Sequence, residues 1–110
     1  MARIVRIAGG GPAGCAAALA ARREGADAEL YEKARLPRHK VCGEFLSGEA
    51  EPVLEALGVS IEILHPARIG SFELCVGRIS RTARLPQYAY GISRYALDAF
   101  LLSHVPSVRQ

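Results

Sequence analysis

Arg3-Ile-Val-Arg-Ile-Ala-Gly-Gly-Gly-Pro-Ala-Gly14 is the stretch of sequence that decides the fold of this chain. Residues 3–8 are rich in Ile and Val and end at glycine, which is typical of a buried parallel strand. An alanine-rich helix follows and ends at Gly25, and a second strand over residues 26–31 ends in the acid Glu32. Strand, glycine turn, helix, strand and acid occur in the order of a dinucleotide-binding βαβ unit. The alternative is a glycine-rich loop without a ligand.

Three glycines of the turn have the spacing GxGxxG, and each has its own mechanical role. Gly9 permits the tight turn out of the strand, Gly11 lets the backbone approach a pyrophosphate, and Gly14 lets the helix pack closely on the sheet. Pro12 suits the first helical turn, where its missing N–H has no partner. The amides of Ala13 and Gly14 are expected to point at the pyrophosphate, with the positive end of the helix dipole behind them.

Glu32 identifies the ligand more closely. It follows Gly14 at close to the ~20-residue interval at which an acid in such units accepts hydrogen bonds from ribose hydroxyls. A carboxylate at this position repels the 2′-phosphate of NADP, so FAD or NAD is favoured there. The alternative is a solvated acid paired with Lys33 or Arg35.

Composition sets the limits on fold and partners. The chain has 110 residues, of which 50% are hydrophobic and 23% charged, as expected of one small globular domain. Its net charge of +3 comes from scattered arginines, which argues against a nucleic-acid surface. No apolar run approaches the ~20 residues of a transmembrane helix. The three cysteines form no CxxC pair, so neither a disulfide framework nor a metal site is predicted, and a reducing cytoplasm is the expected compartment.

The middle of the chain predicts a loop and then a helix. Residues 34–47 have no regular period in their first half and are rich in basic side chains, so we expect a loop over the ligand. Residues 47–59 predict a short helix with Ser47 as N-cap and Gly58 at its end. Pro52 is expected to kink this helix or to delay its start.

The last part predicts a hairpin and a helix. Residues 68–85 alternate with a period near two about a central turn, which indicates two antiparallel strands whose arginines lie on the surface. Residues 91–104 have helical spacing, with Ser93 as N-cap. Arg94 then lies in the first turn, where a cation opposes the macrodipole and calls for a compensating anion. That anion is either a ligand or Asp98, one turn on. With no further strand expected after this helix, the chain is predicted to be a fragment of a longer domain.

Four stretches of the sequence together give a more specific resemblance. The glycine turn, the strand-end Glu32-Lys33, the loop Lys40-Val-Cys-Gly-Glu-Phe-Leu-Ser47 and the pattern Ser93-Arg-x-x-Leu-Asp98 together resemble the N-terminal part of FAD-dependent oxidoreductases. The branch they resemble is that of the geranylgeranyl reductases, within the wider para-hydroxybenzoate hydroxylase superfamily. The motif and the resemblance together predict these cofactor-binding residues: Gly9, Gly11, Pro12, Ala13, Gly14, Glu32, Lys33, Cys42, Gly43, Phe45 and Arg94.

Cys42 has two interpretations. One is a thiol near the flavin that tunes it or gates substrate access, and the other is a small residue that fits a tight loop. Reductases of prenyl double bonds commonly have Pro before this Cys, whereas this chain has Val41. The substrate is therefore expected only to be an apolar or aromatic small molecule.

The predicted fold is α/β: a Rossmann-like FAD-binding βαβ unit followed by the start of an antiparallel substrate-domain sheet. The expected division is residues 1–60 for the βαβ unit, loop and short helix, 61–90 for the hairpin, and 91–110 for the helix that returns to the FAD domain. The resemblance implies FAD as cofactor, NADH or NADPH as transient reductant, and the remainder of a flavoprotein to complete the fold. No motif identifies a catalytic acid or base. The alternatives are a non-catalytic NAD- or FAD-binding module and an inactive fragment.

Overall fold

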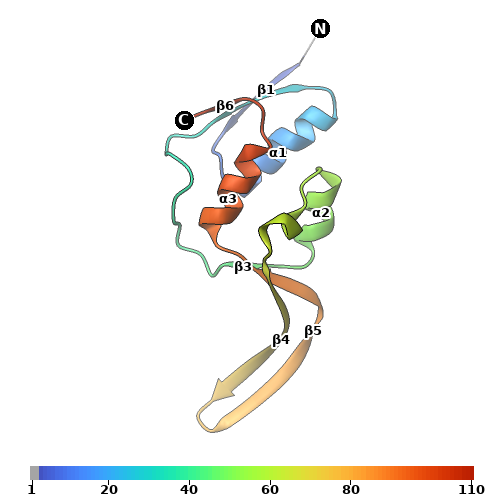
Figure 1. The fold of residues 1–110 in the computed structure, drawn as a ribbon, viewed down its shortest axis with the longest axis vertical. Coiled ribbons are helices and arrows are strands. Elements are labelled where there is room, and N and C mark those ends of the chain that lie inside the picture. Colours follow the sequence, from blue (N-terminus) through green and yellow to red (C-terminus); the bar gives the residue numbers. More distant parts are fainter. Residues whose placement is uncertain (1–2) are drawn as a thin grey trace.

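The computed structural model describes residues 3–110, which form two small sheets and three α-helices (Figure 1). The first sheet and the helices α1 and α3 lie together, and a long hairpin projects away from them, so that the molecule measures 63 × 27 × 21 Å. In chain order the elements are β1 (Ile4–Ala8), α1 (Pro12–Arg23), β2 (Asp27–Tyr31), β3 (Phe45–Leu46), α2 (Ala50–Ala56), the 3₁₀ turn η1 (Ile61–Leu64), β4 (Ala67–Val76), β5 (Ile79–Gly91), α3 (Arg94–Ser103) and β6 (Val108–Arg109).

The first sheet is parallel, with strand order β1-β2-β6. The predicted βαβ unit is confirmed, since β1 and β2 pair directly and α1 connects them. The prediction that no strand follows the last helix was wrong, because β6 pairs with β2 after α3. The Leu30 amide donates to Ser107 O at 2.9 Å and the Glu32 amide to Arg109 O at 2.8 Å.

The burial predicted for the first strand was also wrong. Ile4 is 53% exposed and Val5 38% exposed, and only Ile7 is partly buried against the core. The reason is the place of β1 at the edge of its sheet: within residues 3–110, β2 is its one strand neighbour. On the exposed surface, Arg6 Nε lies 3.1 Å from Glu29 Oε2 on β2.

The second sheet is antiparallel, with strand order β3-β5-β4, and confirms the predicted hairpin. The two-residue turn is made possible by Gly77, whose φ is +58°. Alternation along β4 puts Phe72, Leu74 and Val76 on one face, where each is more than half exposed. The short strand β3 was not predicted, because it lies within the stretch expected to be loop.

The helix α2 is shorter than predicted. It begins at Ala50 with Glu49 as the N-cap residue, so Ser47 lies outside the helix. Pro52 falls in the first turn, where an N–H has no helical acceptor. The later start therefore removes the need for a kink. Gly58 follows the helix with φ of +80°, as expected of a residue that ends one.

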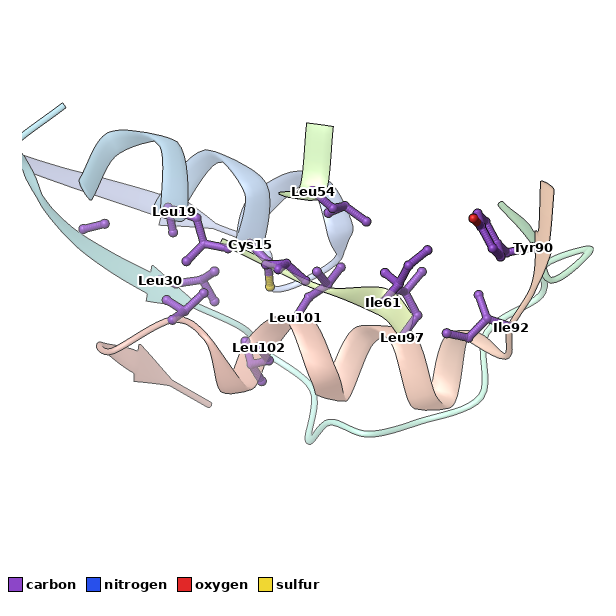
Figure 2. Packing of buried hydrophobic residues seen from close by; sticks show 14 residues of the cluster. Cys15, Leu19, Leu30, Leu54, Ile61, Tyr90, Ile92, Leu97, Leu101 and Leu102 are labelled. Atoms are coloured by element: carbon purple, nitrogen blue, oxygen red, sulfur yellow. The ribbon is translucent and has the colours of Figure 1, made fainter. Parts of the chain in front are cut away.

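The core lies between α1, β2 and α3, with α2 and η1 covering one end (Figure 2). Small residues on α1 allow the helix to approach the sheet, and Ala18 and Cys15 are fully buried. Apolar residues of α3 at helical spacing complete the core, which confirms the predicted helix. The labelled members of the cluster are Cys15, Leu19, Leu30, Leu54, Ile61, Tyr90, Ile92, Leu97, Leu101 and Leu102.

None of the helices within residues 3–110 has the length and apolar character that a membrane crossing demands.

Candidate functional site

The glycine turn connects β1 to α1 through tight backbone contacts. The Gly9 amide donates to Tyr31 O at 2.7 Å, and Gly9 has φ of +109°, a conformation that favours glycine. A Cβ at Gly14 would overlap the carbonyl oxygen of Gly9 and lie 3.0 Å from its carbonyl carbon. Both positions thus require glycine for the reasons that the GxGxxG spacing predicts.

Gly10, between these glycines, has a structural role that the sequence motif did not reveal. Its amide donates to Glu32 Oε1 at 3.0 Å, and a Cβ there would lie 3.1 Å from Glu32 Cβ and 3.2 Å from Leu30 Cδ2. The Cys15 thiol donates to Gly10 O at 3.5 Å. The run of three glycines was the available signal, since the middle one packs against β2.

Gly11 presents a different environment. A Cβ there would meet only Arg94 Nη2, at 3.9 Å, so the space over Gly11 is open. Gly11 is the N-cap residue of α1 and offers no side chain to cap it, while Pro12 has no N–H. The amides of Ala13 and Gly14 occupy the next positions, where a helix provides no internal acceptor. This arrangement suits an anion at the positive end of the helix.

Glu32 lies at the end of β2 and is only 9% exposed. Its Oε1 accepts from Gly10 N, and its Oε2 accepts from Ala34 N at 2.7 Å. These two hydrogen bonds, with help from the charges of Arg38 and Lys40, hold the pKa of the Glu32 carboxyl below its usual range against the effect of burial. Glu32 is therefore an ionised, buried acid bonded to backbone amides, not a solvated acid paired with a neighbouring cation.

A carboxylate has about four lone-pair positions, and the two backbone amides use two of them. The acceptors that remain suit a pair of ribose hydroxyls. The residues present therefore fit the adenosine end of a dinucleotide.

Arg94 brings a cation to the same turn from α3. Ser93 Oγ accepts from Ala96 N at 3.1 Å, which confirms the predicted N-cap. The Arg94 guanidinium then forms two hydrogen bonds with Asp98, from Nε to Oδ1 at 2.7 Å and from Nη2 to Oδ2 at 2.9 Å. Asp98 is completely buried. Arg94 is therefore paired with Asp98 and at the same time lies beside Gly11.

The loop around Cys42 forms a cleft beside Arg94. This cleft has a volume of about 140 Å³, and its lining includes Pro12, Cys42, Phe45 and Arg94. The pKa of Arg94 is raised, chiefly by its hydrogen bonds to Asp98 and further by the Cys42 side chain.

The backbone holds the Cys42 loop in place. The Glu44 amide donates to Cys42 Sγ at 3.3 Å, and Ile92 N donates to Glu44 O at 3.0 Å. The His39 ring stacks on Tyr95 of α3, with centroids 4.8 Å apart. The loop is therefore tied to the start of α3 at several points.

The structure does not bring all predicted site residues into this cleft. Pro12, Cys42, Phe45 and Arg94 line it, whereas the other predicted residues do not: Gly9, Gly11, Ala13, Gly14, Glu32, Lys33 and Gly43. Both Lys33 and Gly43 are exposed. Cys42 is a free, exposed thiol, as is Cys75, whereas Cys15 is buried. Burial, with smaller contributions from the charges of Asp98 and Glu32, raises the pKa of the Cys15 thiol to about 11, so this thiol stays protonated.

No protein-family model matches the chain. A curated relative, the menaquinone reductase of Mycolicibacterium smegmatis, is 43% identical over 56 residues, which is 51% of this chain and 14% of that protein. Among solved structures, the flavin-dependent halogenase CmlS superposes with a TM-score of 0.85 at 28% identity, covering 99% of this chain and 22% of that one. The 2-methyl-3-hydroxypyridine-5-carboxylic acid oxygenase gives a TM-score of 0.82 at 25% identity, covering 98% and 31%.

These matches confirm the predicted α/β fold class. The parallel sheet and the antiparallel sheet of this chain correspond to one portion of the much longer flavin-dependent halogenase. The matches also agree with the wider relationship to flavin-dependent enzymes that the resemblance implies, since the matched structures include a flavin-dependent halogenase and an oxygenase. The chain spans less than a third of the length of the matched proteins.

Proposed function

We propose that this chain holds FAD for a flavin-dependent oxidoreductase, with the dinucleotide along the glycine turn. The observation that carries the proposal is the open backbone surface at Gly11, bordered by the uncapped start of α1 and by Arg94. The ionised carboxylate of Glu32 accepts a hydrogen bond from the amide of the adjacent Gly10. Anion-binding groups and a ribose acceptor thus occur at one glycine turn, as a dinucleotide requires.

Each group has a separate task in this proposal. The amides of Ala13 and Gly14, together with Arg94, bind the pyrophosphate, and Glu32 accepts from the adenosine ribose. The charge of Glu32 repels a 2′-phosphate, which favours FAD or NAD over NADP. When bound, FAD supplies the isoalloxazine that carries hydride and electrons.

The Cys42 loop supports FAD over NAD as the ligand. Cys42 and Phe45 line the cleft beside Arg94, where they extend the apolar contact surface beyond the phosphate turn. We assign Lys33 and Gly43 to the cofactor site on the resemblance alone, since neither lines this cleft.

Several finer features belong to the same proposal. The whole enzyme, of the reductase or the monooxygenase type, acts on an apolar or aromatic small molecule, with NADH or NADPH as transient reductant. The resemblance assigns it to the geranylgeranyl reductase branch. The remainder of the flavoprotein completes the fold. On the resemblance, residues 1–60 belong to the FAD-binding unit, residues 61–90 begin the substrate domain, and residues 91–110 return to the FAD domain. The cytoplasm is the proposed compartment, in keeping with the free cysteines.

FAD binding to the purified protein tests the proposal directly. Titration should quench flavin fluorescence and shift the visible absorption of FAD, and higher ionic strength should weaken the binding. Arg94→Met should reduce the affinity strongly. The matched control is Arg78→Met, which removes the same charge from the exposed hairpin turn.

The same titration separates the alternatives. Bleaching of the bound flavin by NADH or NADPH supports the oxidoreductase, while binding without bleaching supports a non-catalytic module. Absence of FAD binding by the folded protein would contradict the proposal and support an inactive fragment.

A further inference from the structure

We propose that Asp98 is a positioning residue: it fixes the Arg94 guanidinium beside Gly11 so that the protein recognises the pyrophosphate of its dinucleotide. This inference rests on the proposed function of the glycine turn. Asp98 lies one turn into α3 and does not border the open surface at Gly11. Any effect it has on the ligand must therefore pass through Arg94.

The hydrogen bonds to Asp98 leave several N–H donors of the Arg94 guanidinium available for a ligand. Asp98 occupies one edge of the guanidinium, taking the Nε hydrogen and one hydrogen of Nη2. A guanidinium has five N–H donors, so both hydrogens of Nη1 and the second hydrogen of Nη2 remain. Nη2 is also the atom that lies 3.9 Å from the Cβ position of Gly11. The donors left by Asp98 thus belong to a group already at the turn.

Fixing the side chain matters because of its length. A free arginine loses rotamer freedom when it binds an anion, and that loss weakens the binding. In this chain the loss is incurred on folding, because Asp98 is fully buried and the Arg94 side chain is only 21% exposed. Ser93 caps the same helix and fixes the start of α3, from which Arg94 extends.

A purely electrostatic role for Asp98 predicts the opposite effect of substitution. Removing its negative charge makes the turn more positive, so an anion should bind more tightly to Asp98→Asn. If Asp98 positions Arg94, the same substitution should weaken anion binding, since the Asn amide cannot accept from both guanidinium nitrogens. The two roles therefore differ in the sign of the effect.

The test compares ADP with adenosine, because the two differ in the phosphates. Calorimetric titration of both ligands into the protein and into Asp98→Asn gives four affinities. We expect Asp98→Asn to lower the affinity for ADP by about tenfold, which is the effect of one charge-assisted hydrogen bond. The affinity for adenosine should not change. Asp27→Asn is the control, because it removes one negative charge at the exposed start of β2.

A second comparison tests whether the effect passes through Arg94. In an Arg94→Met background, adding Asp98→Asn should cost no further ADP affinity. Three results for Asp98→Asn would each overturn the positioning role. They are an equal fall in the affinities for ADP and adenosine, an unchanged affinity for ADP, and a higher affinity for ADP. If the unsubstituted protein binds neither ADP nor FAD, the proposed function itself fails, and the positioning role fails with it.

One measurement needs no variant. The Arg94 Nε–H should give a slowly exchanging signal in ¹⁵N–¹H spectra of the protein before ligand is added, because Asp98 already holds it. A rapidly exchanging Nε–H that becomes protected only on addition of ADP would overturn the inference, since the ligand itself would then be ordering the side chain.

Discussion

Substitution of two glycines in the same turn should separate packing from ligand binding. At Gly14, a Cβ would overlap the Gly9 carbonyl oxygen and lie 3.4 Å from Ile7 Cγ2. Backbone atoms cannot rotate away, so α1 must move off the turn. Overpacking of this kind costs about 3 kcal/mol, and the better helix propensity of Ala offsets about 1 kcal/mol. Gly14→Ala should therefore destabilise the protein by about 2 kcal/mol.

At Gly11 the expectation reverses. Its φ is −75° and its Cβ position is open except for Arg94 Nη2, so Ala fits without backbone strain. Replacing Gly by Ala at an N-cap costs less than about 1 kcal/mol. The added methyl, however, occupies the surface that a phosphate needs to approach. Gly11→Ala should fold nearly normally and bind FAD at least about tenfold more weakly, a loss of about 1.4 kcal/mol.

Thermal unfolding and FAD titration on both variants provide the measurements. For a protein of this size, 2 kcal/mol corresponds to a fall in Tm of about 10 °C. Gly91→Ala is the matched control, because its Cβ would make only ordinary contacts, at 3.5 Å with Ala67 Cβ and at 3.8 Å with Ile69 Cδ1. An unchanged Tm for Gly14→Ala would refute the packing explanation. Undiminished FAD affinity in Gly11→Ala would show that the ligand does not approach there.

Three further predictions concern Glu32, the cysteines and the cap of α3. The folded-state pKa of Glu32 is lowered, so the protein should lose stability as pH falls below about 4.3, and Glu32→Gln should show a flatter acid limb in denaturant titrations against pH. Thiol titration with an aromatic disulfide reagent should modify Cys42 and Cys75 rapidly and Cys15 only at the unfolding rate, and fast reaction of all three would contradict the burial of Cys15. Ser93→Ala should lower the free energy of unfolding by about 1 kcal/mol, because it removes the N-cap of α3. Ser93→Asp keeps a capping oxygen and should unfold in denaturant like the unsubstituted protein.

The sequence was most informative where the determinants are local. Gly9 and Gly14 mark the turn because a backbone conformation and a close contact each exclude a side chain. Pro12 and Ser93 mark helix starts for equally local reasons, and all four positions are occupied as predicted. Such features depend on neighbours within a few residues, so they can be predicted from the sequence without knowledge of the rest of the fold.

Features set by distant partners could not be predicted in the same way. The strands β3 and β6 have two residues each, too few to show a period, and exist because β5 and β2 offer them hydrogen bonds. The exposure of Ile4 depends on which strands flank β1, not on its own sequence. The hydrogen bond from Ala34 to Glu32 likewise depends on the path of a loop without regular structure.

The candidate site combines both kinds of determinant, and this explains its construction. The glycine turn is specified locally, yet its two charged neighbours come from different elements: Glu32 from the end of β2 and Arg94 from α3. The packing of α1 against α3 sets the distance between them, and β6 fixes the end of β2 through the hydrogen bond from Glu32 N to Arg109 O. A short βαβ motif therefore supplies the phosphate surface, whereas the positions of the acid and the cation depend on the last elements of the chain.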